Sequence, residues 1–442
     1  MIILGINMSG FHSSACLVVN GKIEAAITEE RISRIKQDKS FPVQSINYCC
    51  EVAKIDSLDI TDIYIGWNPV QYMYKSDNTL NEALKDRGKM AYLGLNELAS
   101  MNNEEAAEIK QELKTLNSKW NIHFVDHHKA HLSSTFLLSG FEDSDFFIAD
   151  GFGENTSGFV GTASLNSIDI LEEFRTPHSL GSFYSTFTEF LGFRPNGDEW
   201  KVMALASLGN PDVHYEKVKS LISVNDTGFE LDLSYFEHYL FFTKHYYSEK
   251  FIEIFGKRIS ELEDLTQYHY DLVASVQKFS EDVAIEIANN LHTKTGSRNI
   301  VLAGGFFMNS VLNGKILEKT PYENIFIGGS PDDSGISIGS ALYGWVYDKG
   351  NKKLPDRLNH NYFGKQYNNS DIIKELDKRK IKYEVVEDVE KFAAAKIREK
   401  NIVGWFQGRS EFGQRALGNR SILADPTHSD IKDIVNSSIK YR

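Results

Sequence analysis

Two histidines four residues apart carry the clearest chemical signal in the chain. In the segment VDHHKAHLSS they are His127 and His131, with His128 between them. On a helix this spacing places both imidazoles on one face, where they can share one metal ion. Position 128 is not glutamate, so the segment is not the HExxH motif of metalloproteases. The spacing predicts a metal site; the alternative is a pair of solvent-facing helix histidines.

A metal site of this kind needs a carboxylate from elsewhere in the chain. Asp150 is one candidate, because it occupies a turn directly after an apolar run, FFIA. Asp332 and Asp333, in the segment GSPDDSG, are the others. The residues alone leave the choice among these three open.

Three glycine-rich turns are candidates for binding phosphates. Exposed backbone N–H groups at such turns attract anions, and glycine allows close approach. His12, inside the first turn, either donates to a phosphate or is an ordinary turn residue. The predicted nucleotide-binding residues are Asn7 and Gly10 in the first turn, Gly151 and Gly153 in the second, and Gly304, Gly305 and Asn309 in the third.

A charged loop precedes an apolar run in the segment GDEWKVMALASLGNP. It holds Asp198, Glu199 and Lys201 close together. One interpretation is a helix N-terminus with a solvated charge pair. The other is a loop that contacts substrate, with Lys201 as a catalytic candidate.

The stretch GWFQGRSEFGQRALGNRSILADP interleaves arginines with glycines. Guanidinium groups on a glycine-rich loop can fork around phosphate or carboxylate oxygens. The stretch therefore predicts an anion site formed by Arg409, Arg415 and Arg420.

The elements around these residues indicate an α/β architecture. The first 29 residues read as strand, turn, strand, Asn20-Gly21 hairpin and strand, and residues 146–165 repeat the plan of strand, glycine-rich turn and strand. Such a repeat predicts two related halves facing each other, roughly 1–125 and 126–355. Helices are expected at 180–192 and 268–292. After a polar boundary, residues 365–442 should form another α/β unit, with a helix at 370–379 and strands at 382–386 and 402–406.

Composition narrows the class of protein. The chain has 442 residues, 41% hydrophobic and 25% charged, with a formal net charge of −13. Such an acidic chain is a poor candidate for nucleic-acid binding. Only three cysteines occur, no apolar run is long enough to span a bilayer, and the N-terminus lacks signal-peptide features. We therefore expect a cytoplasmic protein that neither crosses a membrane nor binds nucleic acid.

Seven segments together resemble the NodU/CmcH family of O-carbamoyltransferases, in one order along the whole chain. They are GFHSSACLV, VDHHKAHLSS, FIADGFGE, GDEWKVMALASLG, LAGGFFMNSVLNGKI, SPDDSGISIGSAL and GRSEFGQRALGNRSILADP. The resemblance implies an actin-like ATPase (ASKHA) domain, built from a duplicated RNase H-like unit over residues 1–355. A YrdC-like α/β domain should begin at 365 and be only partly present, because members of the family typically continue past ALGNRSILADP.

The resemblance also implies the chemistry. The YrdC-like domain would make carbamoyl adenylate from carbamoyl phosphate and ATP with Mg²⁺, and Arg409, Arg415 and Arg420 would bind those anions. The actin-like domain would then transfer the carbamoyl group to a hydroxyl of a small metabolite, such as a sugar or natural product. The site residues it implies are His127, His131 and Asp333 as ligands of iron or zinc, with Asp150 beside them. From the turns and the charged loop we expect His12, Asp150 and Lys201 to have catalytic roles.

Two positions depart from the family pattern: Gln414 stands where proline is usual, and Trp200 where glycine is common. Trp200 could reshape the acceptor loop. Three alternatives stay open: a tRNA threonylcarbamoyl transferase, a sugar kinase or other actin-like ATPase, and a non-catalytic nucleotide-binding scaffold. The resemblance also allows a homodimer.

Overall fold

The computed structural model describes residues 1–8, 12–68, 121–240, 243–259, 265–351 and 357–440. Near the N-terminus it holds a mixed five-stranded sheet in the order β3-β2-β1-β4-β5. The pair Asn20-Gly21, both with positive φ (50° and 84°), makes the tight hairpin between β2 and β3, as predicted. The strands are β1 (Ile2–Asn7), β2 (Ser14–Val19), β3 (Lys22–Thr28), β4 (Asp62–Ile65) and β5 (Asn121–Phe124).

A second five-stranded sheet repeats this topology, in the order β8-β7-β6-β11-β12. In both sheets the first strand pairs antiparallel with the second and parallel with the fourth. The strands are β6 (Asp143–Ala149), β7 (Thr156–Ser164), β8 (Ile168–Arg175), β11 (Asn299–Ala303) and β12 (Asn324–Ile327). The repeated topology is that of a duplicated RNase H-like, actin-like fold, so the fold class predicted from the sequence is confirmed. The exact boundaries of the two halves stay a prediction.

Two helices pack together between the sheets: α6 (His127–Ser139) and α13 (Ile336–Tyr343). Helix α6 lies against β6 and β11 of the second sheet, whereas α13 lies against β1 and β2 of the first. Helix α13 therefore comes from the second half of the chain but covers the sheet of the first half. Both sheets consequently share one buried apolar cluster, which includes Val18, Phe136 and Val301.

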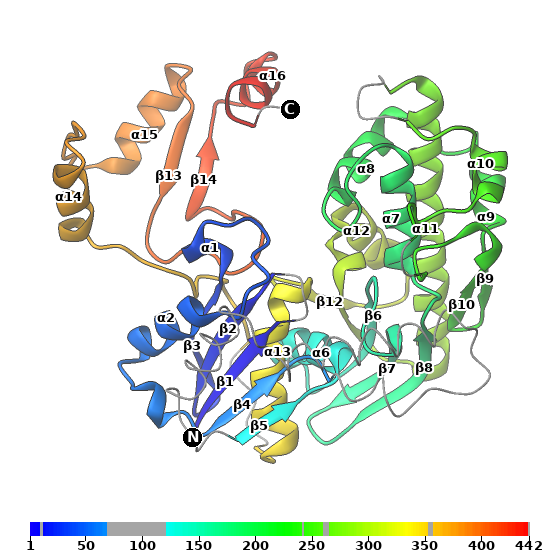
Figure 1. Cartoon of the computed structure of the whole chain (residues 1–442), viewed down its shortest axis with the longest axis horizontal. Helices are drawn as coiled ribbons and strands as arrows, with labels where there is room; N and C mark the ends of the chain where they lie inside the picture. Colours follow the sequence, from blue (N-terminus) through cyan, green and yellow to red (C-terminus); the bar gives the residue numbers. More distant parts are fainter. Residues whose placement is uncertain (9–11, 69–120, 241–242, 260–264, 352–356, 441–442) are drawn as a thin grey trace.

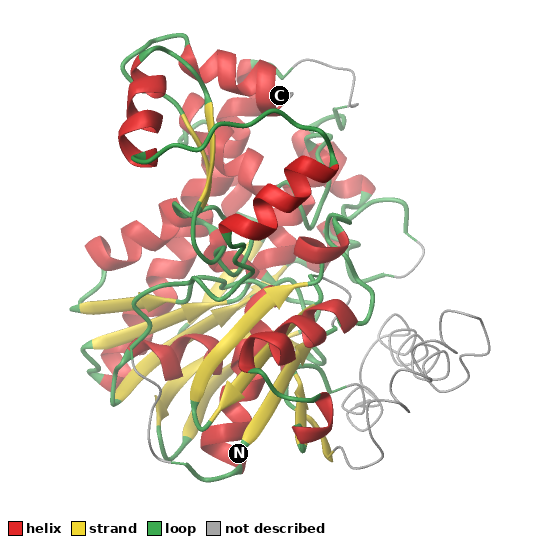
Figure 2. Ribbon diagram, turned by 90° about the vertical axis from the view of Figure 1, so that its left-hand side faces the viewer, coloured by secondary structure: helices red, strands yellow, loops and turns green. Residues whose placement is uncertain are grey.

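The remaining helices cover the outer faces and build a helical lobe on the second half (Figures 1 and 2). The predicted helices at 180–192 and 268–292 are confirmed as α7 and α11. In the described residues before the C-terminal unit, the α-helices besides α6 and α13 are α1 (Glu30–Ser33), α2 (Val43–Ala53), α7 (Leu180–Phe190), α8 (Glu199–Leu205), α9 (Tyr215–Lys219), α10 (Glu249–Phe255), α11 (Gln267–Thr295) and α12 (Ser310–Lys319), with a small hairpin of β9 (Ile222–Asn225) and β10 (Gly228–Leu231).

The C-terminal residues form a smaller α/β unit above the first half (Figure 1). Its elements are α14 (Asn369–Lys378), α15 (Val389–Arg398), the antiparallel pair β13 (Val403–Phe406) and β14 (Arg420–Leu423), and α16 (Ile431–Val435). The strand predicted at 382–386 is wrong: these residues have no strand partner and are largely exposed. Alternating side chains without a neighbouring strand cannot form a sheet.

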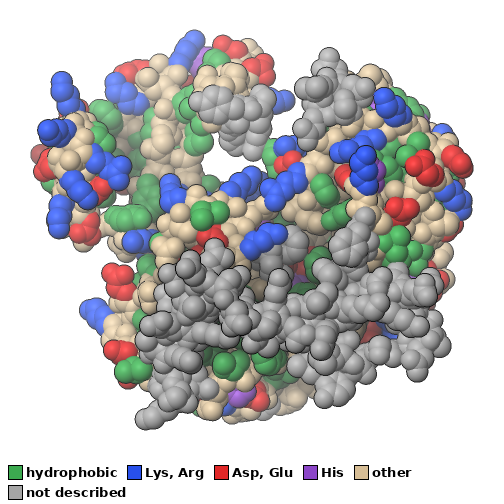
Figure 3. Space-filling view, viewed as in Figure 1, with side chains coloured by type: hydrophobic (Ala, Val, Ile, Leu, Met, Phe, Trp, Pro, Cys, Tyr) green, Lys and Arg blue, Asp and Glu red, His purple; other side chains and the backbone are tan. Residues whose placement is uncertain are grey.

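This unit touches the rest of the molecule at few points. In the space-filling view an open gap separates it from the helical lobe (Figure 3). Its main apolar anchor is Phe412, 2% exposed, which packs into the cluster between the two sheets. No helix among the described residues is long and apolar enough to cross a membrane.

Close packing of α13 depends on glycine. A Cβ added at Gly339 would collide with the carbonyl oxygen of Ala130 on α6, and one at Gly5 on β1 would collide with the carbonyl oxygen of Ser337. We predict that Gly339→Val lowers the free energy of unfolding by about 1–3 kcal/mol or more, because the overpacked helices must separate. Urea unfolding followed by circular dichroism measures this.

Gly314 provides the matched control, since it also lies in a helix but a Cβ there would meet nothing within 4 Å. Gly314→Ala should leave stability unchanged or raise it by about 0.5–1 kcal/mol. Equal urea midpoints of unfolding for Gly339→Val and the unaltered chain would show that close packing of α6 against α13 is not needed for stability.

Candidate active site

Helix α6 presents two buried histidines on one face. It begins at His127, and the carboxylate of its N-cap residue, Asp126, accepts a hydrogen bond from the backbone N–H of Lys129 at 3.2 Å. The side chains of His127 and His131 are 1% and 0% exposed. The helical expectation for this pair is confirmed, and the solvent-facing alternative is wrong.

Two carboxylates meet this pair. Oδ2 of Asp150 lies 3.3 Å from Nε2 of His127 and 3.0 Å from Nε2 of His131. Oδ1 of Asp333 lies 3.7 and 3.5 Å from the same two nitrogens. One ligand atom from each of the four residues lies within 4.8 Å of the other three, which suits a single metal ion. The structure therefore places Asp150 beside His127, His131 and Asp333, the three residues that the resemblance implied as ligands.

The fold explains why these residues converge. Asp150 directly follows β6, and Asp333 follows β12; both strands end at the same edge of the second sheet. Helix α6 starts at that edge and turns its histidines toward it. The carboxyl ends of parallel strands are a usual place for ligands in α/β proteins.

Electrostatics couple the four groups. Burial alone would lower the pKa of His131, but hydrogen bonds and charge from Asp150 and Asp333 raise it to about 10. Burial would also lower the pKa of His127, but Asp333 and Asp150 raise it above its ordinary value. Burial would raise the pKa of Asp150, but the two imidazoles hold it well below its usual range. The carboxylates thus demand positive charge at this point, which two imidazolium groups or one divalent cation can supply.

The third histidine of the motif has a different role. His128 points away from the carboxylates, its Nδ1 lies 2.9 Å from Oγ1 of Thr156, and burial lowers its pKa well below the ordinary value. A Cβ at Gly153 would collide with this ring, so Gly153 makes room for a side chain. Gly153 therefore has a packing reason to be glycine that is independent of any phosphate.

Glu154 is a site residue that the sequence did not reveal. Its carboxylate accepts hydrogen bonds from the backbone N–H of His127, at 3.1 and 3.2 Å, and from that of Asn68, at 2.6 Å. Burial, with the charge of Asp126, raises its pKa to about 7. Glu154 thus ties the first turn of α6 to both halves of the chain.

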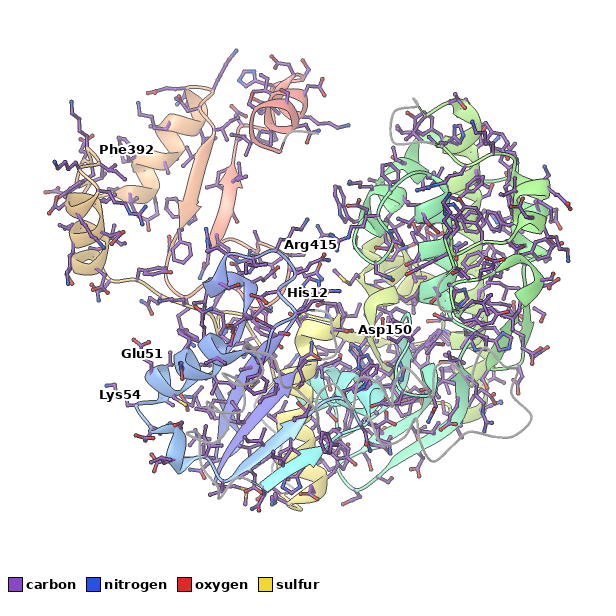
Figure 4. All side chains as sticks on the ribbon, in the orientation of Figure 1. His12, Glu51, Lys54, Asp150, Phe392 and Arg415 are labelled. Atoms are coloured by element: carbon purple, nitrogen blue, oxygen red, sulfur yellow. The ribbon has the colours of Figure 1, made fainter. Side chains whose placement is uncertain are left out.

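A cavity of about 190 Å³ opens beside the two carboxylates. Figure 4 shows Asp150, His12 and Arg415 lying around this region. The first half, the second half and the C-terminal loop (residues 408–420) all contribute to its wall. The described residues that line it are His12, Gln37, Trp67, Asp150, Gly151, Phe152, Gly181, Tyr184, Ser185, Asn196, Gly197, Glu199, Trp200, Met203, Gly305, Phe306, Met308, Asn309, Asp332, Asp333, Gln414 and Arg415.

Asp150 also organises the glycine turns. Its Oδ1 accepts hydrogen bonds from the backbone N–H of Gly151 at 2.7 Å and of Gly305 at 3.2 Å. Gly304 has φ of +96°, and a Cβ there would collide with the carbonyl of Ala149. Gly151 and Gly305 line the cavity, whereas Gly304 is not among its lining residues.

The asparagines of the predicted nucleotide site are also engaged within the protein. Asn309 lines the cavity, but its side chain caps α12 and exchanges hydrogen bonds with Gln277. Asn7 is fully buried, and its Nδ2 donates to the carbonyl of His12 at 3.2 Å. Gly10 lies outside the described residues.

His12 and Lys201 differ in their relation to the cavity. His12 lines it, and its Nε2 lies 3.0 Å from Nε2 of Gln414. Lys201 does not line it; its Nζ pairs with Asp198 at 3.0 Å and lies over the ring of Trp200. Of this charged loop, Glu199 and Trp200 face the cavity.

The three arginines do not converge. Arg409 donates to the carbonyls of Glu24, Phe363 and Gly364, so its guanidinium fastens the C-terminal loop to the first half. Arg420 pairs with Glu411 at 3.2 Å and donates to the carbonyl of Gly413. Arg415 alone of the three lines the cavity. Glycine spacing could not reveal that two of the three guanidinium groups serve the loop itself.

Comparisons with known proteins match this organisation. The family model of the carbamoyltransferase N-terminus matches residues 2–342, and that of the carbamoyltransferase C-terminus matches residues 394–442. Nodulation protein NolNO of Sinorhizobium fredii is 32% identical over 97% of this chain and 60% of its own length. Nodulation protein NolO of Bradyrhizobium diazoefficiens is 34% identical over 72% of this chain and 56% of its own length.

An uncharacterized protein, sll1178 of Synechocystis, is 34% identical over 100% of this chain and 74% of its own length. Full-length HypF, solved in a phosphate- and nucleotide-bound form, is 16% identical over 79% of this chain and 55% of its own, with a TM-score of 0.38, too low to carry an argument. This chain thus spans between 56% and 74% of the lengths of the three sequence relatives. On the match of the N-terminal model to residues 2–342, the chain belongs to the carbamoyltransferase family.

Proposed function

We propose that this chain transfers the carbamoyl group of carbamoyl phosphate to a hydroxyl of a small metabolite, by way of carbamoyl adenylate formed with ATP and Mg²⁺. The observation that carries this proposal is the convergence of His127, His131, Asp150 and Asp333 at the wall of a cavity between the halves of an actin-like fold. The buried free thiols of Cys16, Cys49 and Cys50 agree with the cytoplasmic location included in this proposal.

The donor set fits a divalent metal such as Fe²⁺ or Zn²⁺. Two imidazole nitrogens and two carboxylate oxygens are ligands that both ions accept. Two positive charges on the ion would balance the two carboxylates, whose charge raises the pKa of His127 and His131. When bound, the metal supplies a Lewis acid that polarises the carbamoyl carbonyl.

The chain's own residues would handle the proton of the acceptor. The acceptor oxygen bonds to the carbamoyl carbon, the bond from that carbon to the adenylyl phosphate oxygen breaks, and AMP leaves. The hydroxyl proton must pass to a base, and His12 is the imidazole that lines the cavity. Gln414 donates to Nε2 of His12, because the same amide nitrogen donates to Oδ2 of Asp332 at 2.7 Å. We assign the base role to His12 on its place in the cavity wall; the acceptor's proton would pass to Nε2, which would exchange its hydrogen bond from Gln414 for one from the acceptor hydroxyl.

The helical lobe would receive the acceptor. Its part of the cavity wall combines aromatic surface, from Tyr184 and Trp200, with polar groups from Ser185 and Glu199. Oε1 of Glu199 is fixed by the hydroxyl of Ser185 and the backbone N–H of Asn196, both at 2.6 Å. A carboxylate held beside aromatic rings suits a ligand rich in hydroxyl groups.

The first prediction for this function concerns the metal. We expect about one divalent ion per purified chain after reconstitution with Fe²⁺ or Zn²⁺, and a loss of at least about tenfold in affinity in His127→Ala and in Asp150→Asn, because each removes a ligand. Elemental analysis and competition with a chelator measure both quantities.

The control is His360→Ala, which removes an exposed histidine on the segment that follows the second half. It should bind metal like the unaltered chain. Undiminished metal in His127→Ala would exclude this site, whereas loss in His127→Ala with full retention in Asp150→Asn would leave a three-ligand site.

The second prediction concerns the reaction. The chain is incubated with hydroxylated metabolites in two arms: one with ATP and carbamoyl phosphate, and one with chemically prepared carbamoyl adenylate. We expect mass spectrometry to find an acceptor carrying one added carbamoyl group in the second arm, and its loss in His127→Ala. Carbamoylation in the first arm as well, with release of pyrophosphate, would show that the chain also performs the activation step.

Other products identify the alternatives. A phosphorylated metabolite formed from ATP alone would indicate a kinase, and threonylcarbamoylated tRNA would indicate the tRNA-modifying activity. If neither arm yields a carbamoylated product with any acceptor, the transfer proposal fails.

A further inference from the structure

The C-terminal loop brings a cation to the cavity of the other two parts of the molecule. Arg415 is exposed at the cavity wall, and its guanidinium makes no hydrogen bond or ion pair with any residue that the structure describes. The other two arginines of the loop, Arg409 and Arg420, are bonded to backbone carbonyls and to Glu411. Arg415 is thus the member of the set with its donors available to a ligand (Figure 4).

The loop is held in this position by contacts on both sides of Arg415. Arg31 donates to the carbonyls of Gly413, at 3.1 Å, and of Gln414, at 3.4 Å. Gly413 has φ of +96°, and a Cβ there would collide with Oγ of Ser330. A larger residue could therefore not take this place, and the backbone that carries Arg415 lies directly against the second half.

Gln414 completes the attachment from inside the cavity. Its side-chain nitrogen donates to Oδ2 of Asp332 at 2.7 Å and to Nε2 of His12 at 3.0 Å. One amide group thus connects the C-terminal loop with the first half and with the loop that carries Asp333. The position of Arg415 relative to the proposed metal ligands is fixed through this residue.

Charge shows what Arg415 would recognise. The described cavity wall holds four carboxylates, from Asp150, Asp332, Asp333 and Glu199, and Arg415 is its one Lys or Arg side chain. An anionic ligand would be repelled by most of this wall unless cations face it. It has two places to find them: the proposed metal between Asp150 and Asp333, and the guanidinium of Arg415. Two oxygens of a phosphate group can accept two parallel N–H bonds from the fork of a guanidinium.

We propose that Arg415 binds the phosphate of a nucleotide held in this cavity, and that Gln414 is the positioning residue that keeps Arg415 there. This inference rests on the proposed function and makes its site composite, with residues from both halves and from the C-terminal loop. It differs from the expectation drawn from the sequence, which assigned Arg415 with Arg409 and Arg420 to a separate activation site.

Isothermal titration calorimetry of the full chain with AMP and with adenosine tests the proposal. Arg415→Gln should weaken AMP about tenfold or more and leave adenosine unchanged, because only AMP has the phosphate that the guanidinium contacts. Arg415→Lys should keep part of the affinity, since it keeps the charge but not the fork. Arg398→Gln, on the exposed face of α15, is the matched control and should bind both ligands like the unaltered chain.

A double-mutant cycle separates positioning from general stability. Gln414→Ala should weaken AMP several-fold, and adding it to Arg415→Gln should cost nothing further, because it acts through Arg415. If the losses of AMP affinity in the two variants are additive, Gln414 does not act by positioning Arg415.

The outcomes also separate this inference from the proposed function. Unchanged AMP affinity in Arg415→Gln, or an equal loss of AMP and adenosine, overturns the inference and leaves the carbamoyl-transfer proposal standing. If the unaltered chain binds neither AMP nor adenosine, the cavity is not a nucleotide site, and both proposals are wrong.

Discussion

Compensation of two partly buried carboxylates is the constraint on which the site depends. Asp150 and Asp333 meet His127 and His131 where water is largely excluded, and uncompensated charge there would be costly. The two carboxylates favour positive charge at this point, and they raise the pKa of both histidines against the effect of burial. A divalent ion meets the same demand while leaving the imidazoles neutral, as ligation requires.

The duplicated fold meets this constraint because α13, from the second half of the chain, packs on the sheet of the first half. Helix α6 starts the second half and turns His127 and His131 toward the end of β6, where Asp150 follows. The chain then builds the helical lobe and returns through β12 to Asp333 and α13, which packs onto the first sheet at Gly5 and onto α6 at Gly339. The same packing that joins the halves therefore sets the distance between the ligands, so stability and site geometry are linked.

Much of this arrangement could be predicted from local sequence. The Asn20-Gly21 hairpin, the helical spacing of the two histidines and the glycine turns depend on residues a few positions apart. Contacts between distant segments could not be predicted in this way. The hydrogen bond from Gln414 to His12 joins residues 402 positions apart. The guanidinium of Arg409 donates to backbone carbonyls, among them that of Glu24, 385 positions away. The residues alone left Asp150, Asp332 and Asp333 as open candidates, because the direction of the Asp150 carboxylate depends on how β6, α6 and Gly305 pack.

Asp150 and Asp333 of the proposed metal site line the same cavity as Arg415, so a single ligand there could contact both the metal and the guanidinium. A crystal structure of the chain grown with Zn²⁺ and AMP, with diffraction data collected at the zinc absorption edge, tests it most directly. We expect one strong anomalous peak within bonding distance of Nε2 of His127 and His131 and of the carboxylates of Asp150 and Asp333. The AMP phosphate should lie between that peak and Arg415. An anomalous peak elsewhere, or an AMP phosphate bound away from Arg415, would contradict it.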